Sequence, residues 1–338
     1  MKIKIKNKVI LYLLIIIIEL IGCQHEKRKD LILINPIDSI GVLSDSSYLS
    51  TVYSMILYDK KLFVSDYRNQ RIIELTKSSE KIHTFGTYGH GPGELITSGF
   101  IFINGDSLYV IDEFNTRINV FNIKTKRYLK NYDFSKYGIR NSNFIVNNNI
   151  IFLSTPYMNY PISKFYGNKL IKSFGKWIFN NGLVHKGRSI RKIFLLRNKY
   201  ILAIPESEPF FEIYDLNGNL LSEIQFNYIQ YIKQRYKLSE SEYKKDIKNR
   251  KSILLINDAF LLKEKLYLLL IHNNDNSLKE IQSNILCVLK IANDFSISKV
   301  DYFQLSNNLT YFTAICADTN NILSYSPETN KIYTFKVK

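Results

Sequence analysis

The residue types best suited to catalysis or metal binding are scattered through this sequence. Neither the H-E-x-x-H and C-x-x-C metal motifs nor the G-x-S-x-G elbow of serine hydrolases occurs. Without such spacing, no local pattern brings two ligands to one zinc ion or a base to a nucleophile. We therefore predict no catalytic residue, no metal ligand and no cofactor. The histidines are His25, His83, His90, His185 and His272.

Two carboxylates could form an acid–base pair, because they occupy equivalent places in two gapless copies of one motif, residues 61–75 and 107–121. Each copy has an apolar strand ending in Asp, a turn with Asn, and an Arg-Ile pair that opens a second strand. Asp accepts backbone N–H bonds in turns, Asn tolerates left-handed backbone, and Arg pairs with carboxylates. We therefore expect structural turns of two β-hairpins, not catalytic acids. The turn residues are Asp66, Asn69 and Arg71 in the first copy and Asp112, Asn115 and Arg117 in the second.

A loop rich in glycine, residues 85–95, connects the two copies. Its glycines could cradle a phosphate, but the Lys-Ser/Thr ending of a P-loop is missing, and a strand rather than a helix is expected to follow. The loop fits a tight crossing between sheets better. Tyr88, His90 and Glu94 within it are the candidate ligand-binding residues, and residues 137–143 form a second connection of interest.

Strand patterns recur along the rest of the chain, which has 338 residues, of which 46% are hydrophobic and 14% aromatic. Six apolar segments follow one another at spacings of 46, 42, 50, 66 and 56 residues. These spacings lie near the ~40–50 residues of a four-stranded propeller blade. They predict an all-β fold, a six-bladed β-propeller over residues 31–338. The anchors are Leu62, Leu108, Ile150, Tyr200, Leu266 and Ile322.

The paired D-x-x-N-x-R-I hairpins and the G-x-x-G-x-G-P-G-E loop resemble NHL-type repeats. The chain as a whole resembles the six-bladed β-propeller lipoproteins of Bacteroides-like bacteria. The strong motifs cover residues 62–121, about two blades of six. Because the loops between the blades of a propeller converge on a funnel around the central channel, we expect a non-enzymatic binding or scaffold module. Because related propellers include lactonases and amidating lyases, a metal-dependent hydrolase or lyase is the alternative.

Two features outside the repeats complete the predicted fold. The last blade lacks one strand, and residues 31–35 are the natural candidate to fill it, which would remove an open sheet edge. Residues 227–250 repeat apolar side chains at helical intervals and predict a helical insertion between blades four and five. Ser239 followed by Glu242 fits a capping box, so a second short helix is expected to begin there.

Residues 1–22 have the pattern of a lipoprotein signal peptide. A Lys-rich start precedes the apolar run 9–20, which is shorter than the ~20 residues of a membrane-spanning helix. Gly22 then precedes Cys23, which resembles the lipobox of bacterial lipoproteins and implies lipid attachment at Cys23. Residues 23–30 would form a tether, and Gln24, rather than Asp, after the cysteine favours the outer membrane. We expect the domain in the cell envelope, in the periplasm or at the cell surface.

The formal net charge of +16 could attract nucleic acid or anionic lipid. The lysines are dispersed, however, and no compact basic block occurs outside the N-terminus and the helical insertion. We therefore expect no nucleic-acid partner, but a lipid-anchored monomer that binds a protein, peptide or glycan. Cys287 and Cys316 lie in apolar runs and could form a disulfide or remain buried thiols.

Overall fold

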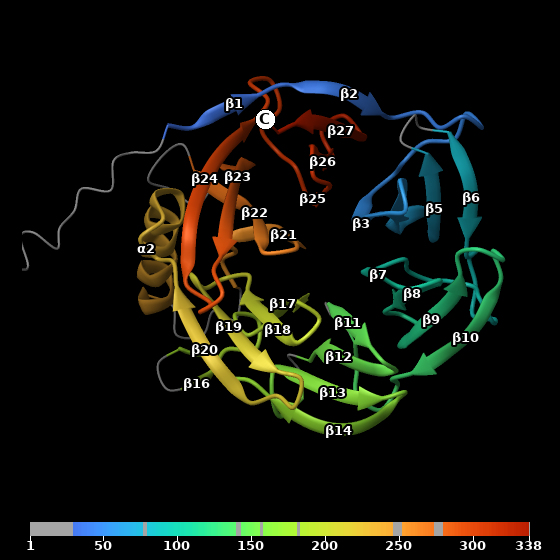
Figure 1. The fold of residues 1–338 in the computed structure, drawn as a ribbon, viewed down its shortest axis with the longest axis horizontal. Coiled ribbons are helices and arrows are strands. Elements are labelled where there is room, and N and C mark those ends of the chain that lie inside the picture. The colour runs from blue at the N-terminus through green and yellow to red at the C-terminus, as the bar shows by residue number, and fades with distance from the viewer. Residues whose placement is uncertain are drawn as a thin grey trace, which may run out of the picture. The chain divides into compact units, whose positions relative to one another are not determined.

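The computed structural model describes residues 30–76, 80–139, 143–155, 158–180, 183–245, 252–273 and 280–337. The predicted signal peptide, Cys23 and nearly all of the predicted tether lie outside these residues. The chain divides into two units, Met1–Leu31 and Ile32–Lys338. The second unit is a six-bladed β-propeller, in which six sheets are arranged in a ring (Figure 1). The predicted all-β, six-bladed propeller is confirmed.

Blades one to three each contain four antiparallel strands. Blade one is formed by β3 (Val52–Tyr58), β4 (Lys61–Asp66), β5 (Arg71–Thr76) and β6 (Lys81–Phe85), with the 3-10 turn η1 (Tyr67–Asn69) between β4 and β5. Blade two is formed by β7 (Ile101–Asn104), β8 (Ser107–Asp112), β9 (Arg117–Asn122) and β10 (Tyr128–Asp133). Blade three is formed by β11 (Phe144–Asn147), β12 (Ile150–Ser154), β13 (Ile162–Tyr166) and β14 (Lys169–Phe174).

The later blades carry the insertions. A short hairpin, β15 (Phe179–Asn180) and β16 (Leu183–Val184), precedes blade four. Blade four is formed by β17 (Arg191–Leu196), β18 (Tyr200–Pro205), β19 (Phe210–Asp215) and β20 (Leu220–Gln225). Blade five contains β21 (Ile256–Leu262), β22 (Lys265–Asn273), β23 (Ile281–Ile291) and β24 (Ile297–Leu305), and blade six contains β25 (Ala314–Ala317), β26 (Asn321–Ser326) and β27 (Lys331–Lys336).

Apolar side chains from neighbouring blades pack against one another and hold the ring together. Between blades one and two, for example, the rings of Phe85 and Phe121 lie 5.7 Å apart, and Phe63 packs in the same cluster. All three rings are at most 3% exposed. Full burial of one such side chain stabilises the fold by roughly 1.5–3 kcal/mol. The alternating strand pattern therefore supplies the apolar surface that each blade presents to the next.

The N-terminal segment differs from the prediction. Within residues 31–35, β1 (Ile32–Ile34) pairs in parallel with β24 and becomes a fifth strand of blade five, so this segment does not fill blade six. The following strand, β2 (Pro36–Ile40), pairs antiparallel with β27 and is the fourth strand of blade six. The hydrophobicity of these side chains does not predict their burial, because Ile32 in β1 is 50% exposed whereas Ile40 in β2 is 3% exposed.

The insertion between blades four and five is helical, as predicted. Its described residues form one helix, α2 (Gln230–Lys245), where two were expected. The predicted helix start at Ser239 is wrong. The Ser239 hydroxyl donates a hydrogen bond of 2.8 Å to the Tyr236 carbonyl in the preceding turn, so it cannot cap a new helix. Ile232 and Tyr243 are at most 3% exposed. The face of α2 that carries them packs on the propeller.

The antiparallel order of the strands gives the propeller two faces. The connection face carries the segments that lead from one blade to the next, such as residues 41–51, 86–100 and 183–190, and the turns between second and third strands. The hairpin face carries the remaining turns, such as residues 59–60 and 105–106. Loops of this kind, positioned by a rigid scaffold, are where binding residues concentrate.

Candidate binding face and central channel

Exposed aromatic side chains are distributed unequally between the two faces. Of the eight found among the described residues, seven belong to the connection face, and Tyr166, at the end of β13, belongs to the hairpin face. Exposed aromatic rings that gather on one side of a protein mark an interaction surface, because their apolar area is costly to leave in water. The seven are Tyr48, Tyr53, Tyr88, Phe114, Tyr160, Phe179 and Tyr228.

The glycine-rich loop forms a supported platform on this face. The guanidinium of Arg117 in β9 donates hydrogen bonds to the carbonyl oxygens of His90 at 2.9 Å, Gly91 at 2.9 Å and Glu94 at 2.7 Å. The planar fork of an arginine suits several such acceptors at once. The backbone of the loop is thereby fixed to the second hairpin motif, although it contains little regular structure of its own.

The three candidate ligand-binding residues in this loop lie in different positions. Tyr88 is 72% exposed, and His90 is exposed with its Nδ1 atom 2.6 Å from Oδ1 of Asn115. Glu94 turns inward, where its carboxylate accepts a hydrogen bond of 2.7 Å from the Gly91 N–H. The platform therefore presents Tyr88 and His90 to solvent and uses the Glu94 side chain within the loop.

The carboxylate of Asp66 is fully buried and accepts three hydrogen bonds. Its donors are the Ser50 N–H at 3.0 Å, the Asn69 amide at 2.8 Å and the Arg71 guanidinium at 3.0 Å. Ser50 belongs to the segment that enters blade one, whereas Asn69 and Arg71 belong to the following turn. Asp66 thus ties a blade connection to its own hairpin.

Asp112 has the same surroundings in blade two. It is fully buried, and it accepts hydrogen bonds from the Thr97 N–H at 3.1 Å and the Asn115 amide at 2.6 Å. Nε of Arg117 lies 3.5 Å from the carboxylate. Both motif carboxylates are enclosed by donors from their own loops, and neither opens toward a shared space where two acids could act on one substrate.

The central channel is lined by side chains from the first strands of all six blades and has a volume of about 270 Å³. Its wall is mainly apolar and includes Phe102, Ile145, Leu195, Phe260 and Ile315. A channel of this kind excludes charged groups unless they are paired. Asp258, the charged residue in this wall, lies near the start of β21, where the channel meets the connection face.

At that end of the channel, an ion cluster links neighbouring blades. Nζ of Lys192 lies 2.9 Å from the Asp258 carboxylate and 3.2 Å from the Glu206 carboxylate. Burial by itself would lower the pKa of Lys192, but these two carboxylates raise it above its ordinary value. Sequence reasoning missed this cluster. The signal available in the sequence was Lys192, a charged residue near the start of β17.

A pair of tyrosines stands beside the cluster. The rings of Tyr53 and Tyr67 are stacked, with centroids 5.6 Å apart and an angle of 23° between their planes. The Tyr53 residue is 41% exposed, yet burial of its hydroxyl, followed by the charge of Glu113, raises the pKa of that hydroxyl. Burial, followed by the charge of Glu113, also raises the pKa of Tyr67, so both hydroxyls stay protonated at neutral pH and can donate hydrogen bonds.

Two hollows flank this region on the same face. One, of about 670 Å³, lies beside Tyr48, Arg68 and Arg71 between blades six and one. The other, of about 340 Å³, lies beside Tyr137 and Tyr160. Tyr137, the first residue of the second predicted connection, therefore borders a concave surface. Aromatic residues line both hollows.

Among the described residues, no group of three His, Cys, Asp or Glu side chains is placed to hold a metal ion. Cys287 and Cys316 are buried thiols in β23 and β25. No helix in the described part of the chain has the length and apolar character needed to cross a membrane.

Comparisons with known proteins give the fold and no more. No protein-family model matches the chain, and no curated protein matches its sequence. A Bacteroides fragilis protein named as exported is similar in structure, with a TM-score of 0.58, 13% identity, and coverage of 91% of this chain and 100% of that one. A DUF4221 family member from Bacteroides vulgatus has a TM-score of 0.57 and 9% identity, with coverage of 92% and 99%.

A third similar structure is that of an enzyme. Virginiamycin B lyase from Staphylococcus aureus has a TM-score of 0.54 and 11% identity, with coverage of 89% of this chain and 99% of the lyase. At such identities the shared feature is the propeller, and a fold of this kind serves many functions.

Proposed function

We propose that the protein is a lipid-anchored, extracytoplasmic propeller that acts as a non-enzymatic binding module for a protein, peptide or glycan on its connection face. The observation that carries the proposal is that seven of the eight exposed aromatic side chains in the described part of the chain belong to that face. Rigid aromatic rings provide large contact areas at low entropic cost, and interfaces are enriched in them. The platform of the glycine-rich loop and the two hollows add shape to the surface.

The proposed location of the protein outside the cytoplasm rests on the N-terminal sequence pattern. The apolar run 9–20 followed by Gly22 and Cys23 fits lipoprotein processing, and a structural neighbour carries the name of an exported protein. Growth with an alkyne-bearing fatty acid should label the wild-type protein but not a Cys23→Ala variant. Labelling of that variant would overturn the anchor.

The binding function can be tested with substitutions on the two faces. Glycan arrays and displayed peptide libraries would first identify a ligand for the wild-type propeller. Tyr88→Ala and Phe114→Ala should each weaken its binding by about tenfold, the effect of losing one aromatic contact. Tyr166→Ala removes an exposed aromatic side chain from the hairpin face and is the matched control. An equal loss in the control would contradict the assignment of the face.

The metal-dependent hydrolase or lyase alternative has weaker support. It rests on the fold likeness to virginiamycin B lyase at 11% identity. The charged groups around Lys192 form ion pairs with one another. The carboxylates of Asp66 and Asp112 accept hydrogen bonds from their own loops. We therefore favour the binding function.

A further inference from the structure

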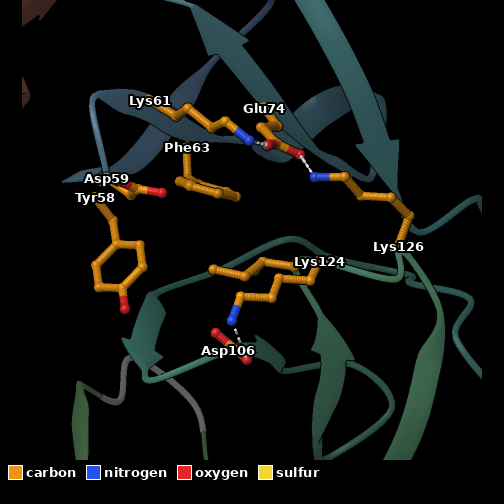
Figure 2. Close-up of a pocket in the computed structure, with 9 residues that line it drawn as sticks. Tyr58, Asp59, Lys61, Phe63, Glu74, Asp106, Lys124 and Lys126 are labelled. Atoms are coloured by element: carbon orange, nitrogen blue, oxygen red, sulfur yellow. Dashed lines mark hydrogen bonds and ion pairs between the residues drawn. The ribbon is translucent and has the colours of Figure 1, made fainter.

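A pocket of about 670 Å³ opens between blades one and two on the hairpin face, opposite the proposed binding face (Figure 2). Its lining comes from the β3–β4 turn, from β4 and β5, and from two turns of blade two. Its volume is within the range of ~300–1,000 Å³ found for small-molecule sites. The lining residues are Tyr58, Asp59, Lys61, Phe63, Glu74, Asp106, Ile123, Lys124 and Lys126.

The inner wall of the pocket is built around the buried carboxylate of Glu74, which is 0% exposed. Lys61 of the same blade pairs with one of its oxygens at 2.8 Å, and Lys126 of blade two pairs with the other. Figure 2 shows the two ammonium groups on either side of the carboxylate. Because one carboxylate balances only one ammonium group, these three side chains together carry a net positive charge.

The two lysines remain partly accessible, with 38% of the Lys61 side chain and 26% of the Lys126 side chain exposed. An ammonium group has three N–H donors, and each of these groups uses one on Glu74. A single lysine would be enough to neutralise the Glu74 carboxylate. The second lysine is therefore in excess of what the buried carboxylate requires.

The rim of the pocket carries a third lysine. Nζ of Lys124 lies 2.9 Å from the Asp106 carboxylate, and the two side chains are 73% and 46% exposed. An exposed pair of this kind contributes little free energy, so Lys124 can exchange its partner at low cost. Asp59, on the opposite turn, is the other acidic group at the rim. The positive charge is thus deep in the pocket, and the acidic groups that balance it are at the surface.

We propose that this pocket binds the anionic group of a small molecule, such as the phosphate or carboxylate of an acidic sugar, between Lys61, Lys124 and Lys126. Charge-assisted hydrogen bonds from lysine suit such oxygens. The buried Phe63 and Ile123 form an apolar floor, and Tyr58 offers a hydroxyl near the entrance. This site is independent of the proposed function, because it lies on the other face of the propeller.

Isothermal titration of the purified propeller with glucose 6-phosphate, glucuronate, inorganic phosphate and glucose tests the proposal. The charged probes should bind and glucose should not. Lys126→Gln and Lys124→Gln should each weaken binding by about tenfold or more, the effect of losing one charged hydrogen bond. Lys126→Gln leaves Glu74 paired with Lys61, so the variant should fold. Lys176→Gln, at an exposed pair on the other face, is the control and should bind normally.

A second experiment separates a ligand site from a structural ion pair. Glu74→Gln removes the carboxylate and leaves its two lysines facing each other, so the variant should melt at a lower temperature than the wild type. Phosphate at fixed ionic strength should then raise its melting temperature more than that of the wild type, because the anion takes the place of the carboxylate. Glu74→Gln combined with Lys126→Gln should lose this specific gain.

Two results would overturn the proposal. One is the absence of binding by all three charged probes to the wild-type protein. The other is binding that survives both lysine substitutions unchanged. Since phosphate stabilises many proteins without a site, an equal gain in the single and double Glu74 variants would also count against it. Loss of binding on the connection face would leave these results unaffected.

Discussion

The ammonium group of Lys192 in blade four lies 2.9 Å from the carboxylate of Asp258 in blade five. The other oxygen of Asp258 accepts a hydrogen bond of 2.8 Å from the backbone N–H of Ile315 in blade six. One side chain therefore connects three consecutive blades at the end of the channel. A change in this cluster is therefore expected to affect both the stability of the ring and the shape of the connection face.

Asp258→Asn should lower the free energy of unfolding by about 2 kcal/mol, because it leaves the largely buried Lys192 with a single carboxylate. Urea unfolding at neutral pH measures the change. Asp301→Asn breaks a more exposed pair with Lys299 and should cost less than about 1 kcal/mol. Equal losses in the two variants would show that the Lys192 cluster stabilises the fold no more than an exposed ion pair does.

Arg117→Lys should loosen the glycine-rich loop. A lysine cannot reach the three carbonyl oxygens that the guanidinium holds, so amide hydrogen exchange should accelerate across residues 86–95. The equivalent change in blade one, Arg71→Lys, removes a bond to the Tyr48 carbonyl and should accelerate exchange near residues 47–50 instead. Identical exchange patterns in the two variants would contradict the assigned contacts.

Gly89→Ala should destabilise the protein more than Gly105→Ala. Both residues have positive φ, 151° and 56°, so both changes introduce backbone strain. A Cβ atom at Gly89 would lie 2.0 Å from a carboxylate oxygen of Glu94, whereas one at Gly105 would meet nothing within 4 Å. We expect Gly89→Ala to cost about 1 kcal/mol more by thermal unfolding, since Glu94 must also give up its bond to Gly91.

Stability should fall as the pH is lowered from about 7 to 5. Burial, followed by the charge of Arg235, lowers the pKa of His272, although a hydrogen bond to Asn284 opposes the shift. Below the ordinary histidine pKa of about 6.5, the unfolded chain then binds more protons than the folded one. His272→Gln should reduce this loss in urea titrations at the two pH values. An equal loss of stability in the wild type and in His272→Gln would contradict this assignment.

The number of blades could be predicted from sequence because each blade repeats a local pattern. Leu62 and Leu108 open apolar strands that end at Asp66 and Asp112, and the spacing between copies gives the repeat length. The pairing of the N-terminal strands could not be predicted in this way. Residues 31–35 and 36–40 both suit a strand, and which partner each takes depends on strands at the other end of the chain.

The candidate sites were less visible in the sequence. The glycine-rich loop identified Tyr88 and His90 at the surface, but the inward position of Glu94 depends on the curl of the backbone around Gly89. Contacts between distant residues were hidden altogether. Lys126 is 52 positions from Glu74 in the chain, and only the packing of blade two against blade one brings them together.

The pairing of β2 with β27 has a consequence for biosynthesis. β2 is made before blades one to five, and its partner is made after them. Until β27 emerges, the sixth sheet is incomplete and the ring has a gap with unpaired backbone on both sides. A nascent chain would therefore need protection, or a delay in folding, for almost the whole time of its synthesis. Transport across a membrane as an unfolded chain would provide such a delay.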